Sequence, residues 1–339
     1  MRCLPEARGE LSEQLLGALA QDVHALEPIA PPSPADPLAD EDLHLALYVA
    51  YELHYRMPPD VDPAWEWEPT LLAFRRELER CFESALRATV APVPAPLDPA
   101  AMDLALRQVD AAAGGPSLAK HLERDGTLEQ MLEFLVHRSA YQLKEADPHS
   151  WALPRLSDGP KAAMVEIQGD EYGGGDPARI HAQLFANSMQ ALGLDPSYGA
   201  YLEQIPGVTL ATVNLMSLFG LHHRLLGAIV GHLALFEMFS SVPNRRYANA
   251  LRRLGFDGAA TDFFDEHVEA DAVHEAIAAV DLAGGLAEQQ PALAPDILWG
   301  AAALAELEAR WATHMLEGWQ SGVGTLRLPL ADAAAFSAA

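Results

Sequence analysis

Apolar residues recur every three to four positions along most of this chain, and stretches that alternate apolar with polar residues are rare. A three-to-four spacing places apolar side chains on one face of an α-helix, whereas a half-buried β-strand needs a spacing of two. The sequence therefore predicts an all-α protein. The expected helices span residues 9–27, 41–57, 67–89, 100–113, 116–146, 160–173, 177–192, 208–241, 244–254, 261–283 and 294–319.

Proline-rich stretches divide these helices. PPSPADP (31–37) separates the first two, and VAPVPAPLDPA (90–100) is typical of a stiff connection between domains. We therefore predict a smaller N-terminal helical region over residues 1–98, a larger helical domain over 99–330 and a tail over 331–339. The 41–57 helix has an apolar face that predicts burial, either in a homodimer or against the same chain: Leu43, Leu45, Ala46, Ala50 and Leu53.

Composition excludes some classes of partner. The formal net charge of the 339 residues is −26, and no basic cluster stands apart from this excess, so we expect no binding to nucleic acid or to an anionic membrane. Cys3 and Cys81 are the only cysteines, too few for a disulfide framework or a thiolate metal cluster. The N-terminus lacks the apolar core of a signal peptide, and no apolar run approaches the length of a membrane span. We expect a cytoplasmic protein.

The stretch HVEADAVHEAI (267–277) places three polar side chains together on the expected 261–283 helix. A helix turns about 100° per residue, so Asp271 and His274 lie about 40° and −20° around the helix from His267. All three side chains share one face. That face could be a solvated stripe, a buried polar network or half of a metal site.

Three glutamates stand in unusual surroundings. Glu237 lies within AIVGHLALFEMFSS, where a lone buried carboxylate would be costly unless it is hydrogen-bonded or neutralised by a cation. Glu171 lies in DEYGGG, where flexible backbone could turn a carboxylate inward, although a surface charge is the simpler interpretation. Glu145 lies in YQLKEADPHSW at the expected end of a helix, where a charged residue in water is the simpler interpretation, although a carboxylate at that end is unfavourable against the helix dipole.

The 177–192 helix carries a further candidate. We expect Asp176 to be its N-cap, Pro177 its first residue and Gly193 its end. His181 lies on the mainly apolar face of this helix, and a lone histidine in such a place is more often a packed core residue than a ligand.

Together these residues form a set of carboxylates and imidazoles without thiolates. Oxygen and nitrogen donors suit iron or manganese and, less distinctively, zinc. Helical bundles build such sites from side chains on facing helices. The chain lacks the paired Glu-x-x-His motifs of ferritin-like proteins, so a ferritin-like site is not indicated.

The order and spacing of these residues resemble those of the haem-oxygenase-like di-iron oxidases, also known as iron-containing redox enzymes. The resemblance covers about residues 120–320 and rests on QLKEADPHSWALPRL, DEYGGG, GHLALFEM, NRRYANALRRLGF and FFDEHVEADAVHEA, in this order. Six candidate ligands follow one another at intervals of 10, 56, 30, four and three residues: Glu171, His181, Glu237, His267, Asp271 and His274.

The resemblance implies a haem-oxygenase-like helical bundle that binds no haem. It implies two iron ions, cycling between Fe(II) and Fe(III), with dioxygen as co-substrate and an external electron donor. Family members that oxygenate nitrogen are similar in having one more glutamate ligand upstream, and Glu145 lies 26 residues before Glu171, at that position. His149, His222, His223 and His232 match no ligand position and are expected to be packing or surface residues.

The expected function is therefore N-oxygenation of an amine, guanidine or amino-heterocycle nitrogen of a small molecule, in specialised metabolism, giving a hydroxylamine, nitroso or nitro product. One alternative is oxidative C–C cleavage, decarboxylation or desaturation on the same scaffold. A non-enzymatic alternative is a helical metal-binding protein without turnover.

Overall fold

The computed structural model describes residues 3–96 and 98–330, with the side chains of all of these except residues 271 and 272. The described chain is helical and contains no β-strand, which confirms the all-α prediction. The predicted tail over 331–339 lies outside the described residues.

The α-helices are α1 (Glu10–Leu19), α2 (Glu41–Glu52), α3 (Pro69–Thr89), α4 (Met102–Ala112), α5 (Leu118–Arg124), α6 (Leu128–Gln142), α7 (Asp147–Ser150), α8 (Asp158–Glu171), α9 (His181–Ala191), α10 (Gly207–Leu221), α11 (Leu226–Phe239), α12 (Ser241–Arg253), α13 (Asp262–Ala276), α14 (Gly285–Gln289) and α15 (Ala294–Ser321). A π-helix, η7 (Ile277–Gly284), joins α13 to α14. The 3₁₀ turns are η1 (Pro63–Trp67), η2 (Pro99–Ala101), η3 (Leu153–Arg155), η4 (Gly173–Gly175), η5 (His223–Leu225), η6 (Gly258–Ala260) and η8 (Pro291–Leu293).

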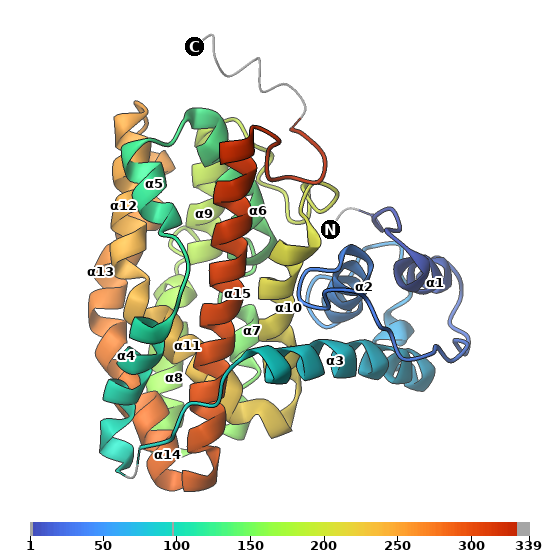
Figure 1. The fold of residues 1–339 in the computed structure, drawn as a ribbon, viewed down its shortest axis with the longest axis horizontal. Helices are drawn as coiled ribbons and strands as arrows, with labels where there is room; N and C mark the ends of the chain where they lie inside the picture. Colours follow the sequence, from blue (N-terminus) through green and yellow to red (C-terminus); the bar gives the residue numbers. More distant parts are fainter. Residues whose placement is uncertain (1–2, 97, 331–339) are drawn as a thin grey trace.

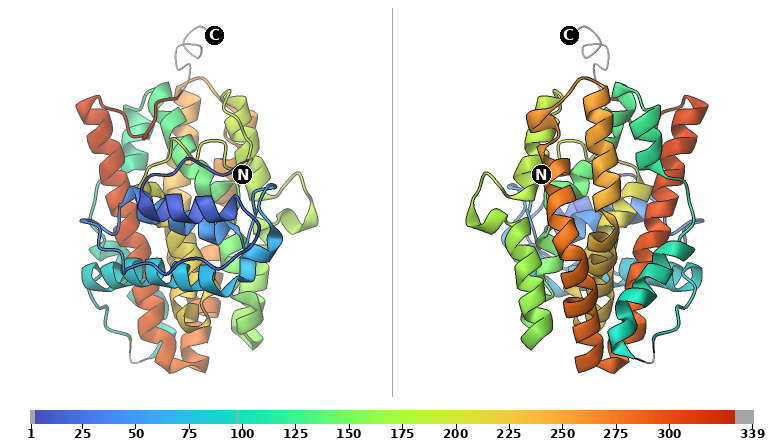
Figure 2. Two further views of the ribbon diagram at one scale, coloured as in Figure 1. Left: turned by 90° about the vertical axis from the view of Figure 1, so that its right-hand side faces the viewer. Right: turned by 90° about the vertical axis from the view of Figure 1, so that its left-hand side faces the viewer.

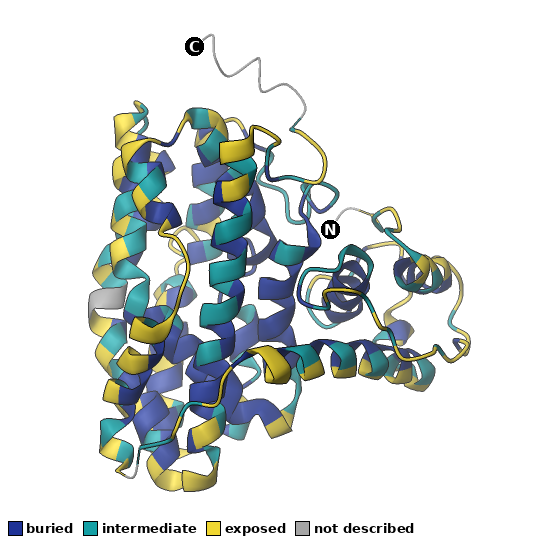
Figure 3. Cartoon of the chain, viewed as in Figure 1, coloured by how far each residue is buried: buried dark blue, intermediate teal, exposed yellow. Residues whose placement is uncertain are grey.

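Most of the helices from α4 onward run along one common axis, and α1 to α3 lie to one side of this bundle (Figure 1). Figure 2 shows the N-terminal helices crossing one face of the bundle. Helices α10 and α11 are buried along most of their length, whereas α12 and α13 alternate buried with exposed residues (Figure 3). The apolar core therefore surrounds α10 and α11, and α11 carries one of the candidate ligands.

Glycines fix α11 tightly against α15. A Cβ atom on Gly231 of α11 would lie 1.8 Å from the carbonyl oxygen of Ile297, and one on Gly300 of α15 would lie 2.1 Å from that of Ala228. The two backbones can approach this closely only because these positions lack side chains. Helix α11 therefore has a fixed position in the core.

The predicted 208–241 helix is wrong as a single element. Helix α10 ends at Leu221, His222 adopts an extended conformation, and α11 begins at Leu226 after a bend of 110°. No single helix in the described part of the chain is long and apolar enough to cross a membrane, although this bent pair reaches that length and apolarity together.

Several predicted helix ends also change. The 9–27 helix ends at Leu19, and the 116–146 helix divides where Thr127 and Gln130 form a capping box at the start of α6. Asp176 caps a turn by accepting a hydrogen bond from the Ala178 amide, and α9 begins only at His181. The predicted N-cap role of Asp176 is therefore wrong, because the chain makes an extra turn before the helix.

The predicted apolar face of α2 is buried within the same chain. All five of its residues are buried, and α2 packs against α1, α3 and α10. The intramolecular alternative is therefore correct for this face, and the prediction that it forms a dimer interface is wrong. A homodimer through the remaining surface of the N-terminal helices stays a prediction.

His44 on α2 gives a pH-dependent contribution to stability. It is fully buried, its Nε2 donates to the Pro37 carbonyl at 3.0 Å, and its Nδ1 accepts from Asn214 Nδ2 at 3.2 Å. Burial lowers the pKa of His44 to about 4, despite the opposing hydrogen bond to Pro37. A proton on Nδ1 would also face the amide donor of Asn214.

An unfolded histidine titrates near pH 6.5, so between about pH 6.5 and 4 only the unfolded chain takes up this proton. The free energy of unfolding should therefore fall as the pH falls through this window, by about 2 kcal/mol from this residue at pH 5. Urea unfolding of wild type and His44→Asn at pH 7 and pH 5 measures this, since the variant should lose less stability on acidification. Equal losses in both proteins would contradict the assignment.

Candidate metal centre

Six of the seven predicted ligands meet inside the bundle. Glu145 follows α6, Glu171 ends α8, His181 begins α9, Glu237 lies in the last turn of α11, and α13 carries the other two. All six are at most 6% exposed: Glu145, Glu171, His181, Glu237, His267 and His274. Asp271 lies on α13 between the two histidines, but its side chain is outside the described residues.

The six side chains form two overlapping groups, in each of which the donor atoms lie within 4.8 Å of one another. The first group is Glu145, Glu171, His181 and His267, and the second is Glu171, Glu237 and His274. Glu171 belongs to both groups. The arrangement therefore has the form of two adjacent metal sites that share one carboxylate.

Short contacts link each glutamate to a histidine. Glu171 Oε2 lies 3.0 Å from His181 Nδ1, and Glu237 Oε2 lies 3.2 Å from His274 Nδ1. Glu145 Oε1 lies 3.5 Å from His267 Nε2. These separations place an oxygen and a nitrogen side by side at three points around the cluster.

The glycines of DEYGGG allow Glu171 and His181 to face each other. Gly173 has a φ of 68°, and a Cβ atom there would lie 2.7 Å from the Ile180 nitrogen. Only glycine fits this left-handed and crowded position without strain. The glycine-rich segment therefore turns the chain back so that the end of α8 meets the start of α9.

A different turn aims Glu145 inward. Helix α6 ends at Gln142, and Ala146 adopts a φ of 71°, which is unusual for a residue with a side chain. Gln168 Nε2 on α8 donates to the Ala146 carbonyl at 2.9 Å and holds this turn. Glu145 therefore follows the helix instead of ending it, and the alternative of a solvated helix-end charge is excluded because its carboxylate is buried.

His267 is oriented by its own helix. Its Nδ1 lies 2.7 Å from the Phe263 carbonyl one turn earlier, so Nδ1 carries the proton and donates this bond. The other ring nitrogen, Nε2, is then directed at Glu145. A backbone carbonyl that fixes the tautomer of a histidine in this way is typical of metal-binding histidines.

Burial disfavours the charged forms of the side chains in the cluster, and only partners of opposite charge oppose this effect. Burial raises the pKa of Glu145 and of Glu237, although each has a histidine that opposes the shift. Burial would also raise the pKa of Glu171, but the neighbouring histidines, His181 first, outweigh it and lower the pKa. For His274, burial is outweighed by Glu237 and Asp170, and its pKa rises to about 9.

The donor set fits a cation. Glu145 Oε2 is buried and has no hydrogen-bond partner in the described structure, and buried Glu171 Oε2 and His181 Nδ1 face each other at 3.0 Å without forming a hydrogen bond. Buried polar atoms without partners are rare in folded proteins and call for an explanation. Oxygen and nitrogen donors converging in this way suit iron, as the sequence predicts.

Comparison with known proteins agrees with this geometry. The sequence profile of a family described as iron-containing redox enzymes matches residues 132–309. The chain belongs to this family. Nitrosourea synthase from Streptomyces achromogenes subsp. streptozoticus is 29% identical over 170 residues, which cover 49% of this chain and 36% of that relative. The chain therefore matches only about a third of the relative's length.

The chemistry of the cluster is compatible with an iron-containing family, but the sequence did not predict that Asp170 and His149 lie beside it. Asp170 Oδ2 lies 3.0 Å from His274 Nε2, and His149 lines the small cavity at the cluster. His149 Nε2 also lies 3.1 Å from Nδ1 of buried His232, so both are packing residues as expected. The available signals were that Asp170 precedes Glu171 and that His149 lies four residues after Glu145.

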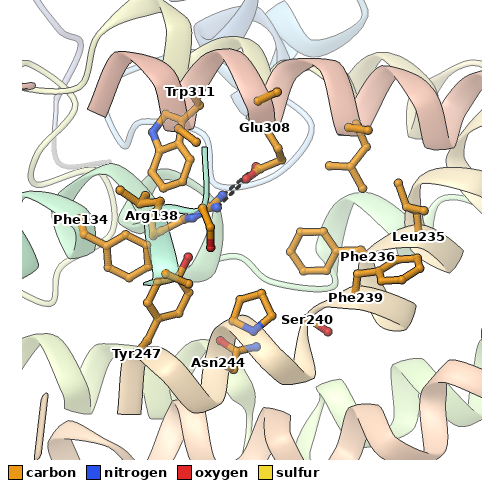
Figure 4. A pocket seen from close by; sticks show the side chains of 18 of the residues that line it. Phe134, Arg138, Leu235, Phe236, Phe239, Ser240, Asn244, Tyr247, Glu308 and Trp311 are labelled. Carbon is orange, nitrogen blue, oxygen red and sulfur yellow. Dashed lines mark hydrogen bonds and ion pairs between the residues drawn. The ribbon is translucent and has the colours of Figure 1, made fainter. Parts of the chain in front are cut away.

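A second cavity, of about 340 Å³, adjoins the candidate metal centre. Its wall shares Phe236, Ser240 and His267 with the small cavity at the cluster. Figure 4 shows Phe236 and Ser240 at one end of this larger cavity, and Arg138, Glu308 and other residues at the opposite end. The candidate ligand His267 is therefore part of the wall that the two cavities share, and the Arg138–Glu308 ion pair lies on another part of the wall of the larger cavity.

Proposed function

We propose that this protein is a non-haem di-iron oxygenase that uses dioxygen to oxidise an amine-type nitrogen of a small molecule. The observation that carries the preference for nitrogen is Glu145, a third buried carboxylate beside Glu171 and His267 at the position implied by the N-oxygenating members. The name nitrosourea synthase, which denotes a product with oxidised nitrogen, supports the same preference.

Two groups of residues would hold the ions. Glu145, Glu171, His181 and His267 would bind one, and Glu171, Glu237 and His274 the other. From its place in the chain we propose Asp271 as a further ligand. When bound, the iron would supply electrons to dioxygen, and an external donor would restore them.

The chain's own residues would position the substrate and exclude water. His267 lies on the cavity wall, so a substrate nitrogen next to it would lie beside the proposed iron site, and the aromatic wall would keep bulk water away. In the net reaction one oxygen atom forms the N–O bond and the other leaves as water, with two electrons and two protons from the external donor. Glu145 would add a negative charge that stabilises the ferric state.

Replacing Glu145 by alanine tests this assignment. We expect Glu145→Ala to reduce the iron bound per chain from two ions toward one and to suppress oxygen insertion, with a smaller effect on folding. The measurements are iron content after anaerobic loading and product mass after incubation with amines, guanidines and amino-heterocycles. A gain of oxygen indicates N-oxygenation, and a loss of carbon or hydrogen indicates the alternative chemistry.

Glu129→Ala is the matched control, because Glu129 is exposed on the same helix that precedes Glu145. Full iron content and unchanged oxygen insertion in Glu145→Ala would show that Glu145 is not a ligand. If the wild-type protein binds iron but consumes no dioxygen with any of the candidate substrates, a metal-binding protein without turnover is favoured. A homodimer, a cytoplasmic location and a role in specialised metabolism also belong to this proposal, and they rest on the sequence alone.

A further inference from the structure

The cavity beside the iron centre has an aromatic wall. The rings of Phe134 and Tyr247 lie 4.4 Å apart, and those of Phe185 and Phe263 lie 5.0 Å apart in an edge-to-face arrangement. A volume of about 340 Å³ lies at the small end of the range for ligand pockets. The cavity therefore suits one small, flat, apolar body.

The charged groups on the wall largely satisfy each other. Both oxygens of Glu308 accept hydrogen bonds from Arg138, at 2.9 and 2.6 Å, and the Arg138 guanidinium lies 3.9 Å from the centre of the Trp311 ring. Figure 4 shows this pair at the end away from Phe236, Phe239 and Ser240. The pair is electrically neutral as a unit, so it offers no spare carboxylate to a cationic ligand.

The remaining carboxylate on the described wall is Asp110. It lies in the last turn of α4, next to the exposed connection over 113–117, and four of these five residues border the cavity. Asp110 therefore lies at the mouth. Apart from the candidate iron ligands, the described wall residues at the Phe236 end include no acidic side chain.

This distribution of charge selects among nitrogen compounds. Aliphatic amines and guanidines are cations near neutral pH, and a cation that enters an apolar site without a counter-ion loses hydration that nothing replaces. Their nitrogen also has no free lone pair to accept oxygen. An amino group on an aromatic ring is uncharged near neutral pH and keeps its lone pair, and its ring can pack edge-to-face with the wall.

We propose that the substrate is an uncharged aryl or heteroaryl amine, whose ring lies among the phenylalanines and whose amino group points toward His267. This inference rests on the proposed function and narrows its substrate from amines, guanidines and amino-heterocycles to one class. Arg138 and Glu308 bound the far end of the ring and accommodate its polar substituents.

Two isomers test the proposal. p-Toluidine and benzylamine have the same atoms and nearly the same shape, but only benzylamine is a cation at neutral pH. We expect isothermal titration of the anaerobic Fe(II)-loaded protein to show at least tenfold tighter binding of p-toluidine. Equal or tighter binding of benzylamine, or no binding of either isomer, would overturn the proposal.

A variant that places a carboxylate in the cavity should reverse the preference. Phe239 borders the cavity at the Phe236 end and is only partly buried, so Phe239→Glu is a tolerable change. We expect Phe239→Glu to favour benzylamine and Phe239→Leu to keep the preference for p-toluidine. An unchanged ratio in a folded Phe239→Glu protein would show that charge does not set the selection.

Binding and turnover separate this inference from the proposed function. Binding is measured without dioxygen, and turnover is then measured by admitting dioxygen with ascorbate as reductant. If p-toluidine binds selectively but gains no oxygen, the proposed function fails and the assignment of the cavity stands. If benzylamine or a guanidine gains oxygen instead of p-toluidine, the proposed function stands and the substrate class is wrong.

Discussion

Replacing Glu171 by alanine is expected to abolish the binding of both iron ions, whereas Glu237→Ala should weaken only one. The reason is geometric, because Glu171 alone belongs to both groups of donor atoms. Removing a group that only hydrogen-bonds to a metal ligand already weakens metal affinity by about 10- to 100-fold. Removing a ligand that both ions share should therefore weaken the affinity for each ion by on the order of 100-fold or more. Iron content after anaerobic titration with Fe(II) measures the difference.

Glu166→Ala is the matched control for this experiment. Glu166 lies on α8 like Glu171, but it is exposed and has no ion pair or hydrogen bond in the described structure. It should keep two ions per chain, and circular dichroism should show that all three variants remain helical. One ion retained at wild-type affinity in Glu171→Ala would mean that the two groups are not joined by this carboxylate.

Much of the candidate site could be predicted because its chemistry is local in sequence. His267 and His274 share a face of α13 by helical periodicity alone, and Glu237 stands out because its neighbours are apolar. The intervals between the candidate ligands then indicated a family, and the family's profile confirms that membership. Whether these residues bind iron stays a prediction.

Other features depended on backbone conformations that side-chain patterns do not encode. The 110° bend falls at His222, in the short polar stretch 222–224 between two apolar runs, and a helix can carry three polar residues without a break, so periodicity did not predict it. The π-helix over 277–284 keeps an apolar pattern that is hard to distinguish from that of an α-helix. The burial of Glu145 depends on the left-handed conformation of Ala146 and on Gln168 from another helix, a contact between residues far apart in sequence.

The N-terminal region also had no chemical motif, yet the structure ties it to the candidate site. Lys144, the residue before Glu145, is 1% exposed and forms an ion pair with Glu52, the last residue of α2, which is fully buried. The Lys144 Nζ atom lies 5.0 Å and 4.4 Å from the centres of the Tyr48 and Tyr55 rings. Residues of the N-terminal region therefore enclose the side chain of Lys144, which is next to the candidate ligand Glu145 in the chain.

Glu52→Ala is accordingly expected to lower the free energy of unfolding by about 3–5 kcal/mol, because it leaves the Lys144 charge buried without its partner. The same change should weaken iron at the group that contains Glu145, since a displaced Lys144 moves its neighbour. Urea unfolding and Fe(II) titration measure the two effects.

The double variant Glu52→Leu/Lys144→Met decides whether charge or packing matters. Replacing both partners of a buried ion pair with apolar residues is often neutral for stability, so the double variant should recover most of the loss seen in Glu52→Ala. Iron binding should recover with it if the unpaired charge is what displaces Glu145. A double variant as unstable as Glu52→Ala would instead show that Lys144 itself stabilises the fold, through the cation–π contacts with Tyr48 and Tyr55 that Lys144→Met removes.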